Sequence, residues 1–471
     1  MSILGHFPRR VIGLVTGRLA RLFGGVPLAL AVVLLGNLAR AEDAAPPLPQ
    51  DLARPGDLID YEPRPALAHP LRACSFRHPL CVHGDAPRGP ATRTEDEILA
   101  LLDAADRAWD VATEALALPP PDVAISLSGT LDLYLVDGDP YATRTLLDLR
   151  DARGGFDRAC AFALVGRGVT PGCALDAAAA RVVARSILFG VAPATDSGSA
   201  IAESVAMARI MVPCSGGPTS GIRLFQSHPE LGLAETLAGP NDSLASTSTR
   251  LVATEGELYA SGASLFYDWL DERYGGYPGA IVRTIWALSP TTTAPDASRW
   301  NDEPDGFEVL RTSFKGALST GSTVDDLWLD FAVARAFLPD YAVRLEWSVD
   351  WPSKPRTLMS GAAVAPTGAA YVSVDCRDRP KGARLRFEAR WEERARLLWT
   401  LVRIDGNGHE VSRVGVPSAD RGTEAQMTLI DLDGVARVLV VGSSAGDPLY
   451  PFDPDDHVWE PHGWVVSLGS E

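Results

Sequence analysis

The pattern of hydrophobic and polar residues changes at about residue 340. Before it, apolar residues recur every three or four positions in several stretches, which is the spacing of a helix with one buried face. After it, apolar and polar residues alternate in short segments, as they do in half-buried strands. The pattern predicts helices at 94–118, 177–190, 200–211, 255–274, 280–288 and 324–338, and strands at 131–136, 161–165, 343–349, 370–374, 383–391, 397–404, 426–430, 436–441 and 463–468.

Two of these segments carry especially clear signals. The helix at 94–118 has Thr94 as a possible N-cap and Glu97 as the partner of a capping box, and three prolines follow it. In the segment 383–391, apolar residues occupy every second position. The residues expected to face inward there are Leu385, Phe387, Ala389 and Trp391.

The order of the elements predicts the fold class. A chain of 471 residues is too long for a single core. Residues 91–340 have strands first and helices after them, which favours an α+β domain with a mixed sheet. Residues 341–471 have about seven short strands with turn residues between them, which is typical of an antiparallel β-sandwich.

The charge of the chain bears on its partners. It has 60 acidic and 43 basic residues, a formal net charge of −17, and only three lysines. An acidic chain with scattered arginines lacks the basic surface that nucleic acid requires, so we expect no nucleic-acid partner.

The first 41 residues resemble a signal peptide. Arginines 9, 10, 18 and 21 precede a short apolar run at 26–38, and Ala-Arg-Ala at 39–41 fits a cleavage site. The Arg-Arg pair faintly resembles a twin-arginine signal without its full motif, so either export route stays open. We expect a secreted or periplasmic protein of the bacterial cell envelope, without a membrane span in its mature chain. Residues 42–90 read as a Pro-rich arm that carries a cysteine pair.

Six cysteines in an exported chain indicate disulfides. Short separations favour Cys74–Cys81 and Cys160–Cys173. The other two, Cys214 and Cys376, are left as a third pair or as free thiols. No Cys-x-x-Cys pair is present, so a structural zinc site is not expected.

The segment 177–211 holds the candidate site. It reads as two helices joined by a loop at 191–200, with Arg181 and Arg185 four positions apart on the first helix. Glu203 is the single carboxylate in the apolar second helix. A carboxylate in such a helix is unfavourable in a core unless it is paired.

A later helix carries a family resemblance. The pattern Tyr259-x-x-Gly262-x-x-Leu265, with Leu270 and Gly275 after it, resembles the Tyr-x-x-Gly helix of the gluzincin metallopeptidases, the group of aminopeptidase N and the thermolysin-like enzymes. In aminopeptidases this tyrosine stabilises the oxyanion. Glu203 resembles the third zinc ligand of the family. The resemblance covers about 125–340 and implies a zincin-like domain.

The catalytic motif of that family, HExxH, is missing. Arg181, Val182 and Arg185 stand at its positions. Arginine has no lone pair to offer a zinc ion, and valine cannot act as a general base. The resemblance therefore implies a pseudopeptidase whose degenerate site is Arg181, Val182, Arg185, Glu203 and Tyr259, with no zinc, no other cofactor and no active catalytic residue. We further expect Glu203 to be held by Arg185 or, second, by Arg181.

The remaining candidate site residues give weaker signals. No two histidines have HxxxH or HExxH spacing, and His69, His78 and His83 are expected at the surface. The acidic turns at 405–408 and 453–456 are weak calcium candidates, and the first reads better as a hairpin turn. The Cys-Ser-Gly-Gly-Pro segment at 214–218 is interpreted as a loop.

These observations favour an exported, catalytically inactive metallopeptidase-like protein that binds peptides or a partner protein through its former active-site cleft. One alternative is an active secreted peptidase or other hydrolase with a non-standard site. Another is a structural or carbohydrate-binding surface protein that uses the β-sandwich.

Overall fold

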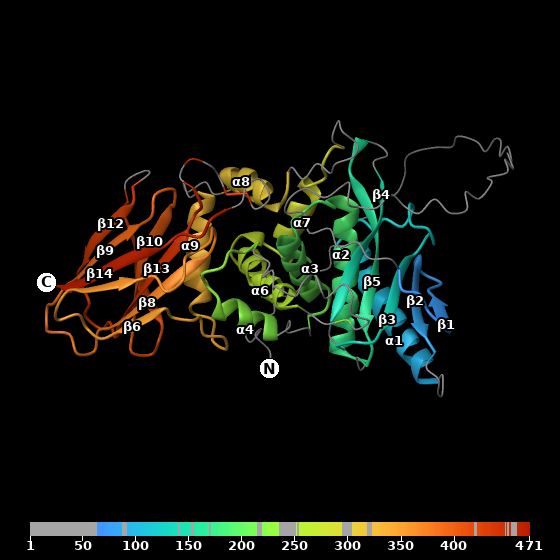
Figure 1. Ribbon diagram of the computed structural model, residues 1–471, viewed down its shortest axis with the longest axis horizontal. Coiled ribbons are helices and arrows are strands. Elements are labelled where there is room, and N and C mark those ends of the chain that lie inside the picture. The colour runs from blue at the N-terminus through green and yellow to red at the C-terminus, as the bar shows by residue number, and fades with distance from the viewer. Residues whose placement is uncertain are drawn as a thin grey trace, which may run out of the picture. The chain divides into compact units, whose positions relative to one another are not determined.

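The computed structural model in Figure 1 describes residues 64–86, 92–139, 142–151, 155–168, 171–213, 219–234, 251, 254–293, 304–317, 323–418, 422–447, 449, 452–453 and 459–471. They belong to one compact unit, Pro49–Glu471. The predicted signal peptide at 1–41 lies outside the described residues. Within the described part of the chain, no helix is long and apolar enough to cross a membrane.

Five strands form the first sheet: β1 (Pro70–Cys74), β2 (Leu80–Asp85), β3 (Leu131–Val136), β4 (Thr143–Asp151) and β5 (Arg158–Gly166). Their order is β1-β2-β3-β5-β4. The three central strands are parallel, and the two edge strands are antiparallel to their neighbours. The predictions at 131–136 and 161–165 are confirmed, and the alternation of side chains gives this mixed sheet two distinct faces.

The hairpin of β1 and β2 lies in the region that was predicted to be an extended arm. It is part of the sheet instead, because Leu80, Cys81 and Val82 of β2 are fully buried next to β3. The apolar run of β2 is only three residues long and is followed by His and Gly, so its sequence does not signal a strand.

Two helices cover one face of this sheet (Figure 1). They are α1 (Thr92–Asp110), which continues as a π-helical turn at Val111–Ala115, and α2 (Cys173–Val191). Thr94 lies inside α1 rather than at its cap. The core between helices and sheet includes Leu101, Leu133 and Val182.

The remaining helices share a second core. They are α3 (Ser197–Met211), α4 (Thr219–Ser227), α6 (Glu255–Leu270, followed by a π-helical turn at Asp271–Gly275), α7 (Ala280–Leu288), α8 (Gly306–Ala317) and α9 (Val324–Arg335). Helices α3, α6, α7 and α9 confirm the sequence predictions, whereas α4 and α8 were missed. The core contains Phe266, Trp286 and Phe331.

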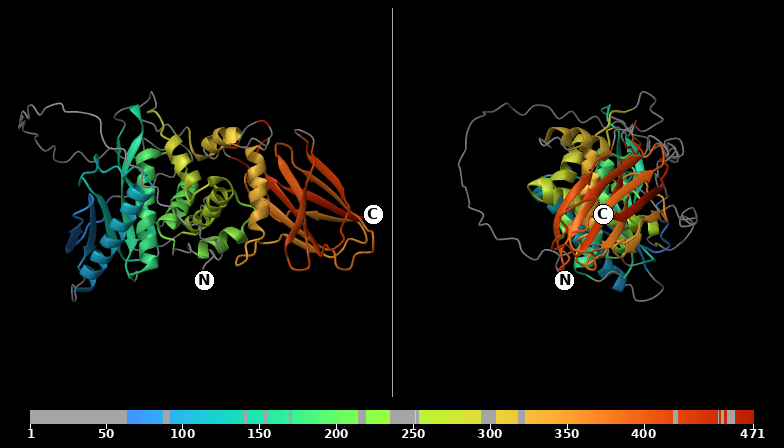
Figure 2. Two further views of the ribbon diagram at one scale, coloured as in Figure 1. Left: turned by 180° about the vertical axis from the view of Figure 1, so that it is seen from behind. Right: turned by 90° about the vertical axis from the view of Figure 1, so that its left-hand side faces the viewer.

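The C-terminal strands form two sheets that enclose one core (Figure 2). The first has the order β11-β10-β13-β8-β6 and the second β12-β9-β14-β7. Their bounds are β6 Trp347–Val349, β7 Arg356–Met359, β8 Ala369–Asp375, β9 Leu385–Trp391, β10 Leu397–Ile404, β11 Glu410–Val416, β12 Glu424–Leu429, β13 Arg437–Ser444 and β14 Trp464–Ser470. Pairing is antiparallel except for β6 and β8, which are parallel. The fold class is therefore α+β with an antiparallel β-rich C-terminal region.

Helix α9 joins the two regions. Ala332 and Val333 of α9 pack against Tyr371 of β8 and Val441 of β13 in a shared apolar cluster. The Tyr371 hydroxyl donates a hydrogen bond of 2.6 Å to the carbonyl oxygen of Ala332.

Candidate functional site

Glu203 lies on α3 and has no exposed surface. Trp286 of α7 donates its Nε1–H to Oε2 of Glu203 over 2.8 Å. The other oxygen, Oε1, faces Gly306 at the start of α8, where a Cβ would lie 2.8 Å from it. Among the described residues, Oε1 has no hydrogen-bond partner. The carboxylate therefore lies where α3, α7 and α8 meet.

Burial sets the chemistry of this carboxyl group. It raises the pKa of Glu203 to about 7, although the hydrogen bond from Trp286 acts in the opposite direction. The nearby hydroxyl of Tyr267 on α6 also favours the charged form, while the charge of Asp196 disfavours it. The pKa of Tyr267 is itself raised well above its ordinary value by burial and by the acids around it. The group can exchange a proton near neutral pH, but it is enclosed.

The predicted ion pair of Glu203 with an arginine is wrong. No salt bridge joins Glu203 to either arginine of α2 in the described part of the chain. Arg185 instead stacks on the ring of Phe189, one turn further along its own helix, with its Cζ 4.5 Å from the ring centroid. Trp286 occupies one side of the carboxyl group of Glu203. Because a protonated carboxyl group carries no charge, it needs no arginine as a counter-ion.

The charge of Arg185 still acts on Glu203 and favours its ionised form, but the remaining predicted site residues do not gather around Glu203. Val182 is fully buried against the first sheet. The Tyr259 hydroxyl donates to the carbonyl oxygens of Leu231 and Gly232, at 3.0 and 3.1 Å. The tyrosine beside Glu203 is Tyr267, two turns later on α6. Sequence reasoning missed Tyr267 and Trp286, because an aromatic residue in an apolar helix looks like ordinary core.

Arg181 belongs to a different polar group, which also includes Arg144 and Arg209 and is called here the arginine cluster. Arg181 is partly buried, and its pKa is lowered to about 10 by burial and by the charge of Arg209. The charge of Glu257 acts to raise the pKa of Arg181. Arg144 of β4 also lies near this glutamate, with its Nε 3.5 Å from Oε1 of Glu257. The cluster thus brings β4, α2, α3 and α6 together.

Helix α6 offers these arginines a polar face. Side chains three or four positions apart share one face of a helix, and the polar residues at that spacing are Glu257, Ser261, Ser264 and Asp268. Arg209 of α3 forms an ion pair with Asp268 and donates to Ser264 Oγ over 2.6 Å. Among the described residues, this face of α6 thus brings the arginines of β4, α2 and α3 close to the carboxylates of Glu257 and Asp268.

Strand β4 lies beside the cluster and has one open edge within the described residues. The Gly166 N–H donates to the Ala142 carbonyl over 3.1 Å, so every second residue counted from Ala142 directs its backbone groups toward β5. The backbone groups of Thr143 and Thr145, at the positions between, point to the open edge. A register shift between Leu147 and Leu149 ends the regular edge.

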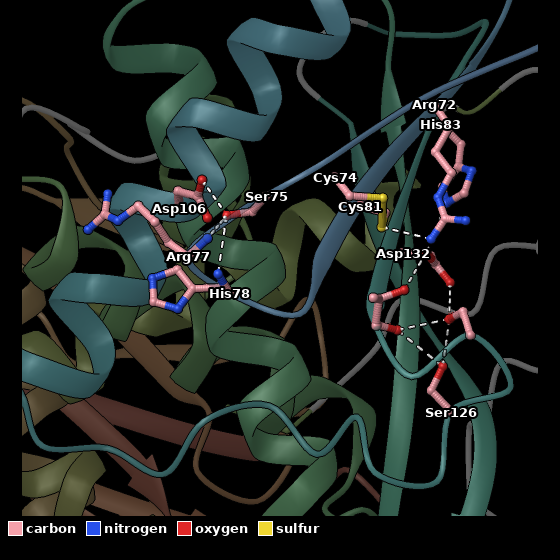
Figure 3. Close-up of a disulfide and its surroundings, with 12 residues drawn as sticks. Arg72, Cys74, Ser75, Arg77, His78, Cys81, His83, Asp106, Ser126 and Asp132 are labelled. Carbon is pink, nitrogen blue, oxygen red and sulfur yellow. Dashed lines mark hydrogen bonds and ion pairs between the residues drawn. A yellow bond between two sulfur atoms is a disulfide. The ribbon is translucent and has the colours of Figure 1, made fainter.

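The cysteine predictions are partly correct. Cys74 and Cys81 form a disulfide with a Cα–Cα distance of 4.1 Å (Figure 3). The predicted Cys160–Cys173 bond is wrong, because Cys160 is a buried free thiol while Cys173 is disulfide-bonded elsewhere. Cys376 is also a buried free thiol, which excludes its pairing with Cys214. Cys214 lies outside the described residues. Closeness in sequence selected the wrong partner because Cys160 points away from α2, to the opposite face of the sheet.

Histidines and acidic turns were the remaining candidates. His78 and His83 are mostly buried rather than at the surface, each with 15% of its side chain exposed, and they contact Asp110 and Asp132. The turn at 405–408 joins β10 to β11, as predicted for a hairpin. Much of the turn at 453–456 lies outside the described residues. Among the described His, Cys, Asp and Glu side chains, no group of three could hold a metal ion.

A cavity of about 440 Å³ has a different set of lining residues. Its walls are formed by Pro119, Pro120, Asp122, Asp157, Arg158, Gly190, Val191 and Pro290. It includes none of the predicted site residues, so the proposed cleft and this cavity are separate places.

Comparisons with known proteins give little further guidance. No family model matches the chain, and no curated protein matches it. Among solved structures, it is similar to the pre-peptidase C-terminal domain of a collagenase from Bacillus anthracis, with 8% identity, a TM-score of 0.17, 27% of this chain and 97% of that chain covered. The tailspike protein 4 of bacteriophage CBA120 is similar over 25% of this chain and 18% of its own, with 10% identity and a TM-score of 0.18. The VP2 particle of infectious bursal disease virus is similar over 25% of this chain and 33% of its own, with 13% identity and a TM-score of 0.16.

Proposed function

We propose that this chain is an exported, non-catalytic binding protein built on a metallopeptidase-like plan. The observation that carries the proposal is the edge of β4 next to α2, which is open within the described residues and lies where a peptidase of the gluzincin type would hold its substrate. The order of β3, β4, β5, α2 and α3, with β4 antiparallel at the sheet edge, supports that plan. The signal-like segment at 1–41 supports export.

The residues at the positions of the HExxH motif are not compatible with peptide hydrolysis. Arg181 and Arg185 cannot ligate zinc, and Val182 cannot take a proton from a water molecule. Glu203 is fully buried beneath Trp286 and so is closed to a metal ion or substrate. We therefore expect neither zinc nor peptidase activity.

Binding would use the backbone of β4. An extended peptide can add a strand to an open sheet edge, where main-chain hydrogen bonds supply affinity. Thr143 and Thr145 offer the outward backbone groups, and the arginine cluster lies beside them. Arginine pairs well with carboxylates, so the ligand we propose is an extended peptide with acidic side chains or a free C-terminal carboxylate.

The two alternatives have less support. A hydrolase with a non-standard site is favoured by the pKa of Glu203 near 7, but the burial of that residue leaves no room for a substrate. A carbohydrate-binding sandwich would need a platform of aromatic rings. On the described strands of the sandwich, the one strongly exposed aromatic residue is Trp347, with 39% exposure.

A proline substitution tests the binding mode. Thr145→Pro removes an N–H that points away from β5, and an edge strand tolerates proline at such a position. We expect Thr145→Pro to weaken binding of acidic peptides about tenfold or more in fluorescence titrations. Thr145→Val keeps the N–H and is the matched control. Equal affinity for all three proteins would contradict binding along β4.

Charge removal tests the ligand class. Arg144→Gln and Arg181→Gln should each weaken binding of acidic peptides by about tenfold, because a close charge pair is lost. Arg390→Gln, on an exposed part of β9, should leave the affinity unchanged. The expected absence of zinc is tested separately by elemental analysis. About one zinc per chain that disappears in Glu203→Ala would refute the proposal of a non-catalytic protein.

A further inference from the structure

The first sheet has a second face, opposite α1 and α2, that carries buried polar residues. Alternation places Leu133 of β3 toward the helices and Asp132 away from them. The same rule places Phe162 of β5 and His83 of β2 on this second face, where Asp132 lies next to His83 and Ser126 (Figure 3). Asp132 is fully buried there.

A second aspartate lies on the same face. Asp148 of β4 sits at the register shift, and 8% of its surface is exposed. Its Oδ2 is 3.6 Å from the thiol of Cys160, which is on the second face of β5. Two carboxylates held in one buried region repel each other, so this arrangement requires a cation.

That cation is Arg64, in the segment before β1. Its Nε and Nη2 donate to the two oxygens of Asp148 over 3.1 and 2.6 Å, the parallel fork typical of a guanidinium on a carboxylate. Its Nη1 donates to Oδ2 of Asp132 over 2.5 Å, and Nη2 also donates to Oγ of Ser126 over 3.1 Å. The ring of Phe162 lies 5.8 Å from the guanidinium carbon.

The electrostatics agree with this geometry. Burial acts to raise the pKa of Asp132, but hydrogen bonds from His83 and Ser128 and the charge of Arg64 hold it well below its ordinary value. Burial likewise opposes the charge of Arg64, yet Asp148 and Asp132 raise its pKa above the ordinary value. Asp132 is thus kept as an anion for the guanidinium.

We propose that Asp132, Asp148, Ser126 and Phe162 form a receptor for an arginine side chain, occupied here by Arg64 as a tethered ligand, and that an arginine of another polypeptide can take its place. Every receptor group belongs to the sheet or to the loop before β3, whereas Arg64 comes from outside the sheet. The Arg64 side chain is 21% exposed, so the receptor is partly open to solvent. A guanidinium that enters from another chain would make the same contacts, and only the tether favours Arg64.

Chemical rescue of Arg64→Ala tests the receptor. N-acetyl-arginine amide should bind this variant saturably, seen by calorimetry and as a rise in melting temperature. N-acetyl-lysine amide should bind about tenfold more weakly, because ammonium cannot form the fork. A peptide with the sequence of residues 61–69 should bind more tightly than the amino-acid amide, and its Arg→Lys version should not.

Two further proteins complete the design. Wild type should respond about tenfold less to the same ligands, because tethered Arg64 competes. The double variant Arg64→Ala with Asp148→Asn should fold without bound ligand, because only one buried aspartate then lacks its guanidinium partner. It should not bind the arginine derivative. If Arg64→Ala alone is unfolded, the arginine derivative should refold it and the lysine derivative should not. Absence of saturable binding or refolding, or equal effects of the two derivatives, overturns the proposal.

Discussion

Glu203 illustrates how the surroundings of one residue decide its chemistry. The sequence identified it as an acid out of place in an apolar helix, and the structure agrees that it is fully buried. Its partners were not predictable, because Trp286 lies 83 positions away and the helix that brings it close is placed by the shared core. The expectation of an arginine partner followed from the rule that buried charges are paired. The protein instead raises the pKa of the group.

This raised pKa makes stability depend on pH. The folded protein holds a proton on Glu203 up to about pH 7, whereas the unfolded chain releases it near 4.5. Stability from this group is therefore full below pH 4.5 and falls as pH rises toward 7. We expect Glu203→Gln to be more stable than wild type at pH 8, by about 3 kcal/mol, and nearly equal to it at pH 4.

Urea unfolding across this pH range measures the effect. Glu424→Gln is the matched control, because that side chain is 74% exposed and should not alter the pH dependence. If Glu203→Gln shows the same slope with pH as wild type, Glu203 is ionised in the folded protein and the assignment of its pKa fails.

The cysteines allow a second test at the residue scale. Burial raises the pKa of Cys160 to about 12 and that of Cys376 to about 11, so few thiolates are present at neutral pH. We expect both to resist iodoacetamide in the folded protein and to react after denaturation. Peptide mapping without reduction should find Cys74 linked to Cys81. By elimination among the six cysteines, Cys173 should be linked to Cys214, and a Cys160 crosslink would contradict the structure.

At the scale of elements, long periodic helices were predictable and short or interrupted ones were not. The helix at 280–288 was predicted with the bounds that α7 has. Helix α4 has nine residues and follows a Gly-Gly-Pro run, and β7 has four residues, so neither carries enough repeats for its period to be recognised. The apolar positions of β9 were predicted correctly, since all four are buried.

The Tyr-x-x-Gly pattern of α6 also has a packing explanation. A Cβ on Gly262 would lie 2.3 Å from the carbonyl oxygen of Gly221 and 2.6 Å from Cβ of Phe225, both on α4. The ring of Tyr259, on the same helix, is tilted against the ring of Phe225, with ring centroids 5.2 Å apart. The residues that carry the family resemblance therefore serve the close approach of α6 to α4.

This close approach predicts a large effect of a small substitution. Gly262→Ala should destabilise the protein by about 1–3 kcal/mol, despite the better helix propensity of alanine, because backbone atoms of α4 must move. The free energy of unfolding from urea titration measures it. Gly415→Ala on β11 is the control, since a Cβ there meets nothing within 4 Å. A neutral or stabilising Gly262→Ala would show that the two helices have room to separate.

At the scale of the whole molecule, the sequence predicted an α+β region followed by a β-rich one, but not how they are joined. The change of pattern near residue 340 suggested a boundary after the last helix. That helix, α9, instead packs on β8 and β13 through apolar residues of its own. The amphipathic pattern of a helix indicates that it has buried faces but does not tell which core each face enters.

The residue that ties α9 to the other helices is Arg335. It is 2% exposed, lies 3.8 Å from the Phe225 ring centroid, and donates to the carbonyl oxygen of Phe225 over 2.6 Å and to Oε1 of Gln226 over 2.9 Å. The hydroxyl of Tyr371 donates a hydrogen bond to the carbonyl oxygen of Ala332, one turn earlier on α9. One helix is thus fixed to α4 by a guanidinium and to β8 by a phenol.

These two contacts should couple the unfolding of the helical region to that of the β-rich region. We expect wild type to show one cooperative calorimetric transition. Arg335→Met with Tyr371→Phe should split it in two, because the first removes two buried hydrogen bonds at the junction and the second removes one. Each lost hydrogen bond should cost about 1–3 kcal/mol. The control is Tyr277→Phe, because Tyr277 is 55% exposed, and this variant should leave a single transition. A double variant that still unfolds in one step would mean that the apolar contacts of α9 alone couple the two regions.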